Sequence, residues 1–284
     1  MAPIDNSSLA VDISKVAGGE TTKRADNVAV EEPLEIQLCS RTAEGSAAKS
    51  ISITMRTPGD DADLAVGFLY TEGIIRSGAD VASIEQIGDV SADTGERNTV
   101  RVELEPQVDI DFDRLQRHFY TTSSCGVCGK ATLDALRVAG QAPLTEDQSR
   151  FTRTLIGTLP DRLMSQQRVF TQTGGLHAAL VFDTDGTVVV VREDVGRHNA
   201  VDKVVGALAF EGRLPASGLG LLVSGRASFE LMQKALVAKM PLLAAVGAPS
   251  SLAVRTAQEF DMTLIGFLRD DRFNIYAGEQ RIIQ

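Results

Sequence analysis

The chain has few cysteines, no long apolar segment and no surplus of positive charge. Its 284 residues include three cysteines, too few for a disulfide framework. No run approaches the roughly 20 apolar residues that span a bilayer, and residues 1–14 lack a basic region followed by an apolar core. We therefore expect a cytoplasmic protein that does not enter a membrane. The net charge of −10 argues against nucleic acid as a partner, because phosphate binding needs a basic surface.

The first part of the chain predicts a disordered tail followed by a small α+β domain. Residues 1–28 mix small and polar types without a period and are expected to be disordered. The domain over 29–118 follows, and Cys39 within it is expected to pack as a small hydrophobe. Apolar and polar residues alternate in its expected strands, and its expected helices are amphipathic. The strands are Leu34–Leu38, Ile51–Met55 and Val100–Leu104, and the helices are Asp61–Thr71 and Phe112–Phe119.

The second part, residues 119–284, predicts a mixed sheet covered by helices, because short apolar strands alternate with amphipathic helices. The first two strands should form a hairpin, and the later ones should run parallel because each reaches the next through a helix. The expected strands are His177–Phe182, Val188–Val191, Leu219–Val223, Leu242–Val246 and Leu264–Leu268. The expected helices are Leu133–Val138, Asp161–Thr171, Asn199–Phe210, Phe229–Lys239 and Leu252–Phe260.

Two of the cysteines, Cys125 and Cys128, lie in the polar, glycine-rich segment Ser123–Lys130. Small flanking residues, nearby backbone N–H groups and a lysine favour the thiolate, the reactive form of cysteine. The spacing fits a dithiol redox pair, half of a zinc site or a persulfide carrier. A zinc site would need further ligands, of which His177 is a candidate, although no fourth donor stands nearby. A zinc nucleobase deaminase would place a glutamate where Ala179 stands, so that reaction is not expected.

Polar residues also gather where the expected strands end. Ser224–Ser228 and Gly247–Ser251 each open a helix, which suits either helix capping or phosphate binding. Five of the seven residues in Glu193–Asn199 are polar. Within that segment Arg197 or His198 could meet an anion. The structural alternative is that Asp194 bonds to Arg197 or to helix N–H groups and only fixes the turn.

The last expected strand continues through a two-residue turn into another strand, and two arginines flank two aspartates at the tip. Arginine grips phosphate and a carboxylate can accept hydrogen bonds from guanine, so the tip could bind a guanine nucleotide. The alternative is a solvated hairpin tip with local ion pairs.

Taken together, four motifs resemble the formate dehydrogenase accessory sulfurtransferases, the FdhD family. The motifs are Ser124–Lys130, Gly174–Ala179, Arg192–Lys203 and Val223–Arg226, and the resemblance spans roughly residues 30 to 280. It implies a small N-terminal domain, a larger domain with a cytidine-deaminase-like core, and a homodimer.

The resemblance also implies an activity. The protein would accept sulfur from a cysteine desulfurase, pass it to the molybdenum cofactor in its bis-guanine-dinucleotide form, and so serve formate dehydrogenase. Cys125 would bear the persulfide with Cys128 as its partner, and no permanently bound metal is expected. The family's cofactor-binding stretch falls on Phe267, Leu268, Arg269, Asp270, Asp271 and Arg272. Further candidate contacts with the polyanionic cofactor are Arg197, His198 and Arg226.

Two alternatives to a sulfurtransferase remain at this point. A non-enzymatic chaperone that holds the guanine-dinucleotide cofactor would explain the polar strand ends and make the cysteines accessory. A zinc protein would use Cys125, Cys128 and His177.

Overall fold

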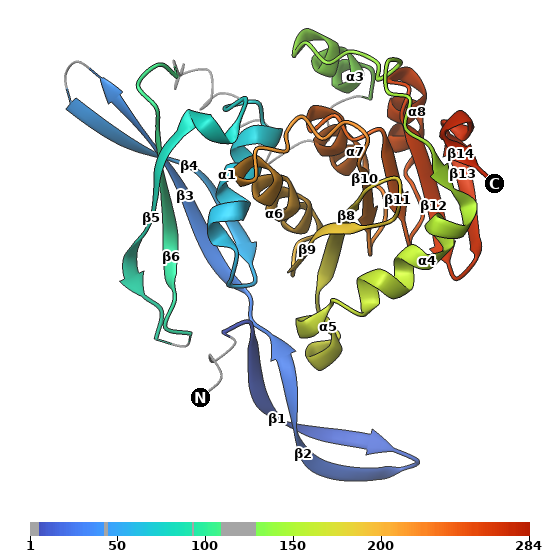
Figure 1. The fold of residues 1–284 in the computed structure, drawn as a ribbon. Coiled ribbons are helices and arrows are strands. Elements are labelled where there is room, and N and C mark those ends of the chain that lie inside the picture. Colours follow the sequence, from blue (N-terminus) through green and yellow to red (C-terminus); the bar gives the residue numbers. More distant parts are fainter. Residues whose placement is uncertain (1–5, 43–44, 93, 109–128) are drawn as a thin grey trace.

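The computed structural model describes residues 6–42, 45–92, 94–108 and 129–284. Figure 1 shows two sheets on opposite sides of a pair of helices, α1 (Asp61–Thr71) and α6 (Arg197–Phe210). The expected α+β organisation, with a mixed sheet covered by helices, is confirmed. The helix expected over residues 112–119 lies outside the described residues.

The first sheet has four strands in the order β4-β3-β6-β5, with β3 antiparallel to β4 and parallel to β6. The three expected strands lie within β3, β4 and β6, and the helix expected at Asp61–Thr71 is α1. The inward side chains of this sheet pack against α1. The bounds are β3 (Glu32–Thr42), β4 (Gly45–Arg56), β5 (Val81–Val90) and β6 (Arg97–Leu104), with the short 3-10 helix η1 (Gly78–Asp80) before β5.

The second sheet has six strands in the order β13-β12-β11-β10-β8-β9. β8 and β9 form the expected hairpin, and β10, β11 and β12 run parallel, as expected. β8 is antiparallel to β10, and β12 is antiparallel to β13. The bounds are β8 (His177–Phe182), β9 (Val188–Asp194), β10 (Gly220–Val223), β11 (Leu242–Ala245), β12 (Thr263–Arg269) and β13 (Arg272–Ala277).

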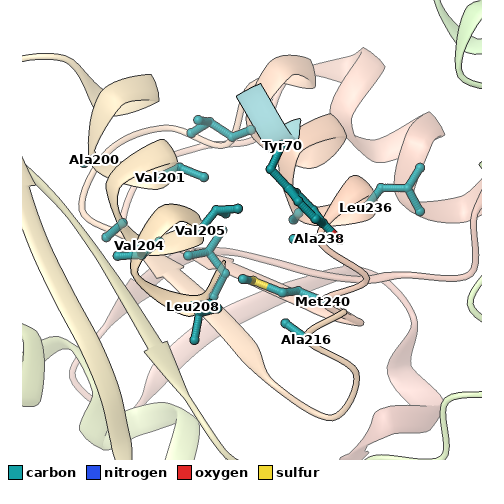
Figure 2. Close-up of a cluster of buried hydrophobic side chains, with 14 of the residues drawn as sticks. Tyr70, Ala200, Val201, Val204, Val205, Leu208, Ala216, Leu236, Ala238 and Met240 are labelled. Atoms are coloured by element: carbon teal, nitrogen blue, oxygen red, sulfur yellow. The ribbon is translucent and has the colours of Figure 1, made fainter. Parts of the chain in front are cut away.

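Helices cover both faces of the six-stranded sheet, which explains why its strands are continuously apolar. In β8, Ala179 and Val181 belong to the core on the α6 side, whereas Leu180 and Phe182 belong to the core on the α4 side. The larger core runs from the four-stranded sheet through α1 and α6 to the six-stranded sheet, and Figure 2 shows Tyr70 of α1 within it. The helices are α3 (Gly129–Val138), α4 (Arg153–Met164), α5 (Arg168–Thr173), α7 (Phe229–Val237), α8 (Ser251–Glu259) and the 3-10 helix η2 (Glu279–Arg281).

One predicted helix is wrong in its bounds. The sequence predicts a helix over Asp161–Thr171, but α4 begins at Arg153, contains Pro160 and ends at Met164, and α5 follows separately. A proline inside a helix removes one hydrogen bond and ordinarily marks a helix start or break. Here the burial of one apolar face of α4 against the sheet outweighs that cost. Directly before α4, β7 (Phe151–Thr152) pairs in parallel with β14 (Ile282–Ile283) from the end of the chain.

The disordered tail predicted for residues 1–28 is also wrong from residue 8 onward. β1 (Ser8–Ala17) and β2 (Glu20–Ala29) form an antiparallel hairpin with ten paired positions. Gly18 and Gly19 both have positive φ, as a two-residue hairpin turn requires. The alternation of Leu9, Val11 and Ile13 was the available signal, but polar residues dilute it in β2.

The N-terminal unit (residues 32–104) contains the four-stranded sheet and α1, and the C-terminal unit (residues 129–284) contains the six-stranded sheet and α6. The two units meet where α1 crosses α6 at two glycines. A Cβ on Gly67 would overlap the main-chain oxygen of Asp202, and a Cβ on Gly206 would overlap that of Asp63. The helix backbones therefore touch directly, with no space for a side chain. Beneath the crossing, buried Lys234 of α7 lies 2.9 Å from both carboxylate oxygens of Asp202 and so ties α7 to α6.

We expect Gly206→Ala to destabilise the protein. Alanine favours a helix over glycine by about 1 kcal/mol, but the overlap with a main-chain atom cannot be relieved by a rotamer change. Overpacking costs about 1–3 kcal/mol or more, so urea unfolding should show a net loss of stability. Gly157→Ala in α4 is the matched control, because its Cβ would meet its nearest atoms at 3.4 Å. Equal stability of the two variants would contradict the proposed close crossing.

Candidate functional site

One edge of the six-stranded sheet gathers most of the polar motifs. β10 and β11 end there, and α6, α7 and α8 begin there. Because β8 is antiparallel to β10, its first residue His177 lies at the same edge. The backbone N–H of Ser224 donates to the Ala178 carbonyl, and the Ser224 hydroxyl accepts from the Ala178 N–H, both at 2.9 Å. The turn after β10 is thereby fixed to the start of β8.

The turns at this edge lie side by side and are joined through their backbones. The N–H of Gly247 donates to the Gly225 carbonyl at 3.0 Å, and the N–H of Phe267 donates to the Gly247 carbonyl at 3.1 Å. The spacing is tight at both glycines, since a Cβ on Gly225 would lie 3.3 Å from Nδ1 of His177, and one on Gly247 would lie 3.1 Å from Cγ of Arg226. The result is a row of turns from His177 to Phe267.

Positively charged side chains along this row have spare hydrogen-bonding capacity. Within the described part of the chain, the guanidinium groups of Arg197, Arg226, Arg269 and Arg272 show neither an ion pair nor a hydrogen bond. Nε of Arg197 and Nε2 of His198 are buried without a partner. Buried polar atoms are ordinarily satisfied. Unpartnered donors beside helix N-termini are the groups that a polyanionic ligand would satisfy.

Asp194, in the same polar segment, instead joins the two units of the protein. This carboxylate is fully buried and accepts from the N–H of Gly196 at 2.8 Å and from the amide of Asn199 at 2.9 Å. It also pairs with Nζ of Lys203 at 2.8 Å. Asp194 therefore fixes the turn, as the structural alternative supposed, although its charged partner is Lys203 rather than Arg197.

The partners of these residues lie on the N-terminal unit. Nζ of Lys203 donates to the Thr57 carbonyl at 3.0 Å, and the amide of Asn199 donates to the Met55 carbonyl at 2.8 Å. Glu193 instead caps α5, because its carboxylate accepts hydrogen bonds from two backbone N–H groups at the start of that helix. The segment thus holds the fold together, while Nε of Arg197 and Nε2 of His198 take no part in these hydrogen bonds.

The two histidines have lowered pKa values for the same main reason. Burial lowers the pKa of His177, and the positive charge of Arg197 lowers it further, while Asp194 partly offsets both. Burial also lowers the pKa of His198, with Arg197 and Lys234 adding to the effect and Glu230 opposing it. Both imidazoles are therefore neutral at pH 7, able to donate and accept hydrogen bonds.

The stretch from Phe267 to Arg272 divides between surface and core. Phe267 has φ of 53° and is 51 % exposed, an unusual conformation for a bulky side chain. Leu268 is fully buried against α4, so its side chain belongs to the core rather than to a ligand site. Arg269 pairs with Arg272 across the tip, as the sequence predicted. Asp270 and Asp271 form the turn, both exposed.

The cysteine pair, Cys125 and Cys128, lies outside the described residues. Cys39 is buried in the four-stranded sheet, as expected for a small hydrophobe. Among the described residues, no three His, Cys, Asp or Glu side chains are grouped to hold a metal. The zinc alternative stays untested because two of its three ligands are the cysteines outside that range.

No described helix is long and apolar enough to cross a membrane.

Sequence reasoning missed two features of this edge. Burial raises the pKa of Glu230, but hydrogen bonds from its own backbone N–H and from the Ser228 side chain lower it below its usual value, and the nearby charges of His198 and Arg197 lower it further. Its position in the first turn of α7 is also typical of helix capping, so the sequence has no signal for the contact. The second is the position of His177 beside Gly225, which depends on the antiparallel course of β8.

Comparisons with known proteins agree on one family. The profile described as the FdhD/NarQ family matches residues 29–283. A Streptomyces coelicolor protein named sulfur carrier protein FdhD is 50 % identical over 272 residues, covering 95 % of this chain and 94 % of its own. A Saccharolobus solfataricus protein of the same name is 42 % identical, covering 95 % and 96 %.

A solved structure supports the fold. It is described as a candidate formate dehydrogenase accessory protein from Desulfotalea psychrophila. It is similar to this chain with a TM-score of 0.71 and 21 % identity, covering 97 % of this chain and 99 % of its own.

We expect the imidazoles of His177 and His198 to titrate below 6.5 in the free protein. A depressed pKa contributes stability that is present above pH 6.5 and is lost as pH falls through the folded-state pKa. An anion bound beside Arg197 should raise both values. Histidine NMR titrations with and without GDP would measure them, with His177→Gln and His198→Gln assigning the signals. Midpoints at or above 6.5 without ligand would contradict this reading of the site.

Proposed function

Since the chain belongs to the FdhD/NarQ family, we propose that it is a sulfurtransferase of the cytoplasm that carries sulfur on Cys125. The sulfur would come from a cysteine desulfurase and go to the molybdenum cofactor in its bis-guanine-dinucleotide form, for formate dehydrogenase. The names of the relatives support sulfur carriage. The observation that carries the cofactor part is the row of unpartnered guanidinium groups at the sheet edge, together with the unpartnered Nε2 of the neutral His198.

The sulfur-loading step needs a thiolate and no metal. The Cys125 thiolate attacks the outer sulfur of the desulfurase persulfide, and a new S–S bond forms while the old one breaks. Cys125 then bears S–SH and the desulfurase leaves with its own cysteine as thiolate, so no external electrons are needed. Cys128 is proposed as the supporting thiol.

The acceptor is proposed to bind along the edge. Two pyrophosphates and two guanines make it large and strongly anionic, and this chain has a net charge of −10. Binding therefore depends on a local concentration of positive groups. Arg197, His198 and Arg226 are proposed contacts in the row, and Arg269 and Arg272 are proposed contacts at the hairpin tip. The exposed Phe267 and the carboxylates of the tip are proposed to face guanine, with Leu268 supporting them from the core.

The proposal includes a homodimer. The cofactor carries two guanine-dinucleotide halves, and a symmetric pair of subunits could bind one half each.

We expect Cys125→Ala to abolish sulfur loading and leave GDP binding nearly unchanged. After incubation with a cysteine desulfurase and cysteine, mass spectrometry should find an adduct of about 32 Da, one sulfur atom, on the peptide holding Cys125. Cys39→Ala is the matched control, since Cys39 is buried in the four-stranded sheet. A protein that binds GDP but never gains sulfur would instead be a cofactor-binding chaperone. Full loading of Cys125→Ala would refute the assignment.

We expect Arg269→Glu or Arg226→Glu to weaken GDP binding, because each replaces a phosphate-binding charge with a repelling one. Charged hydrogen bonds are worth about 1.5–3 kcal/mol, so the Kd should rise by about tenfold or more. Calorimetry would measure it. Arg213→Glu is the control, because Arg213 follows the opposite end of α6. Equal Kd values for all three variants would support the alternative interpretation, in which the tip is a solvated hairpin turn with local ion pairs.

A further inference from the structure

The hairpin of β1 and β2, hereafter the arm, stands apart from the rest of the protein. Figure 1 shows it projecting from the body. Among the described residues its two strands form a sheet with each other alone. Only its base is anchored, where Ser8 bonds to Gln172 of α5 and the Cβ of Ala29 lies near Gly175.

An arm of this kind needs a further partner. A two-stranded ribbon alone is at best marginally stable in water, and its outer edges offer unpaired N–H and C=O groups to another strand. On β2 an apolar side chain is also left in solvent, since Val28 is 42 % exposed. Ten paired positions are more than a connecting loop would require.

We propose that the partner is the arm of a second copy of this chain, with β2 pairing antiparallel to the partner's β2 around a twofold axis at Ala25. This inference rests on the arm alone and does not depend on sulfur transfer. It names a surface through which the proposed dimer could form.

Symmetry restricts how two identical strands can pair. A twofold axis perpendicular to the ribbon leaves each face of the ribbon pointing the same way in both copies. Two residues that lie opposite each other across the interface must therefore have side chains on the same face. The two residue numbers in any opposite pair are therefore both even or both odd. The number halfway between them belongs to a residue that lies opposite its own copy, and the axis passes between these two copies.

The charges of β2 then select the register. Arg24 and Asp26 lie on one face, opposite Ile13 and Val11 of β1, and they form an exposed ion pair within the chain at 3.4 Å. An exposed pair of this kind adds little stability, so both groups can also pair across the interface. With the axis at Ala25, Arg24 faces the partner's Asp26, and the same pair repeats by symmetry. An axis at Lys23, Arg24 or Asp26 would place that residue against its own copy, and like charges directly opposite are destabilising. An axis at Thr22 would also set opposite charges against each other, Glu20 and Arg24, but it would pair only residues 20–24 of β2, whereas the axis at Ala25 pairs residues 21–29.

The other edge of the arm has no such solution. In β1, Asp12 and Lys15 lie on opposite faces because their positions differ by an odd number. They cannot face each other across a twofold axis. Charge complementarity thus assigns the interface to β2, and pairing would give a four-stranded sheet in which β1 of each copy is the outer strand.

A cysteine at the axis tests the pairing directly. In the full chain with Cys39→Ala, Cys125→Ala and Cys128→Ala, the variant Ala25→Cys should form an intermolecular disulfide on mild oxidation, since antiparallel neighbours lie within disulfide range. Val16→Cys in the same background is the control, because Val16 is more exposed than most of the arm but lies on the outer strand. We expect cross-linking at position 25 to be at least about tenfold faster.

Charge variants show whether the contact is between copies. Added to the Ala25→Cys chain, Arg24→Asp alone and Asp26→Arg alone should each slow cross-linking, because like charges then face each other. An equal mixture of the two should restore the rate, since each chain supplies the charge that the other needs, while repulsion within each chain remains. Equal rates for positions 16 and 25, or a mixture no faster than its components, would overturn the proposal. This background lacks Cys125, so neither result bears on sulfur loading.

Discussion

The arrangement of the whole protein depends on the direct backbone contact between α1 and α6. Gly67 and Gly206 allow each helix to touch the main chain of the other, and no other residue type permits that distance. The contact makes one continuous core from two sheets. It also holds α6 in place, and the first residues of α6, Arg197 and His198, belong to the candidate site. Packing at the middle of one helix thereby positions the chemistry at its end.

Buried charges reinforce this contact at two levels. The pair Lys234–Asp202 lies beneath the crossing, and the pair Lys203–Asp194 lies at its edge, each at 2.8–2.9 Å. Burial raises the pKa of Asp202, and burial alone would lower that of Lys234, but the nearby carboxylates raise it instead. Such pairs add little net stability, yet losing one partner costs about 3–5 kcal/mol because a buried charge remains. Both pairs lie within the C-terminal unit, and Asp202 and Lys203 also hydrogen-bond to Thr71 and Thr57 of the N-terminal unit. Separating the units would take these hydrogen bonds from buried charged groups.

The candidate site is the part of the surface that this internal pairing leaves unsatisfied. In the segment from Glu193 to Asn199, the buried carboxylate and amide serve the fold, and the cationic groups stay available. A net negative protein can bind a polyanion only where positive groups are concentrated and freed from internal partners. The row of glycine-containing turns brings such groups together from strands that are distant in sequence.

The sequence alone determined the local elements and the family. Short continuous apolar runs predicted β8 and β10, and a period-3.6 pattern predicted α1, each to within about a residue. The four motifs identified the FdhD resemblance. Local patterns failed where tertiary contacts dominate: burial keeps α4 helical through Pro160, and β1 and β2 are too polar to show a clear period. Only the tertiary structure decided which polar residues of a motif are structural. Some of their partners, Thr57 and Met55, lie more than 130 positions away, so no local pattern separates Asp194 from Arg197.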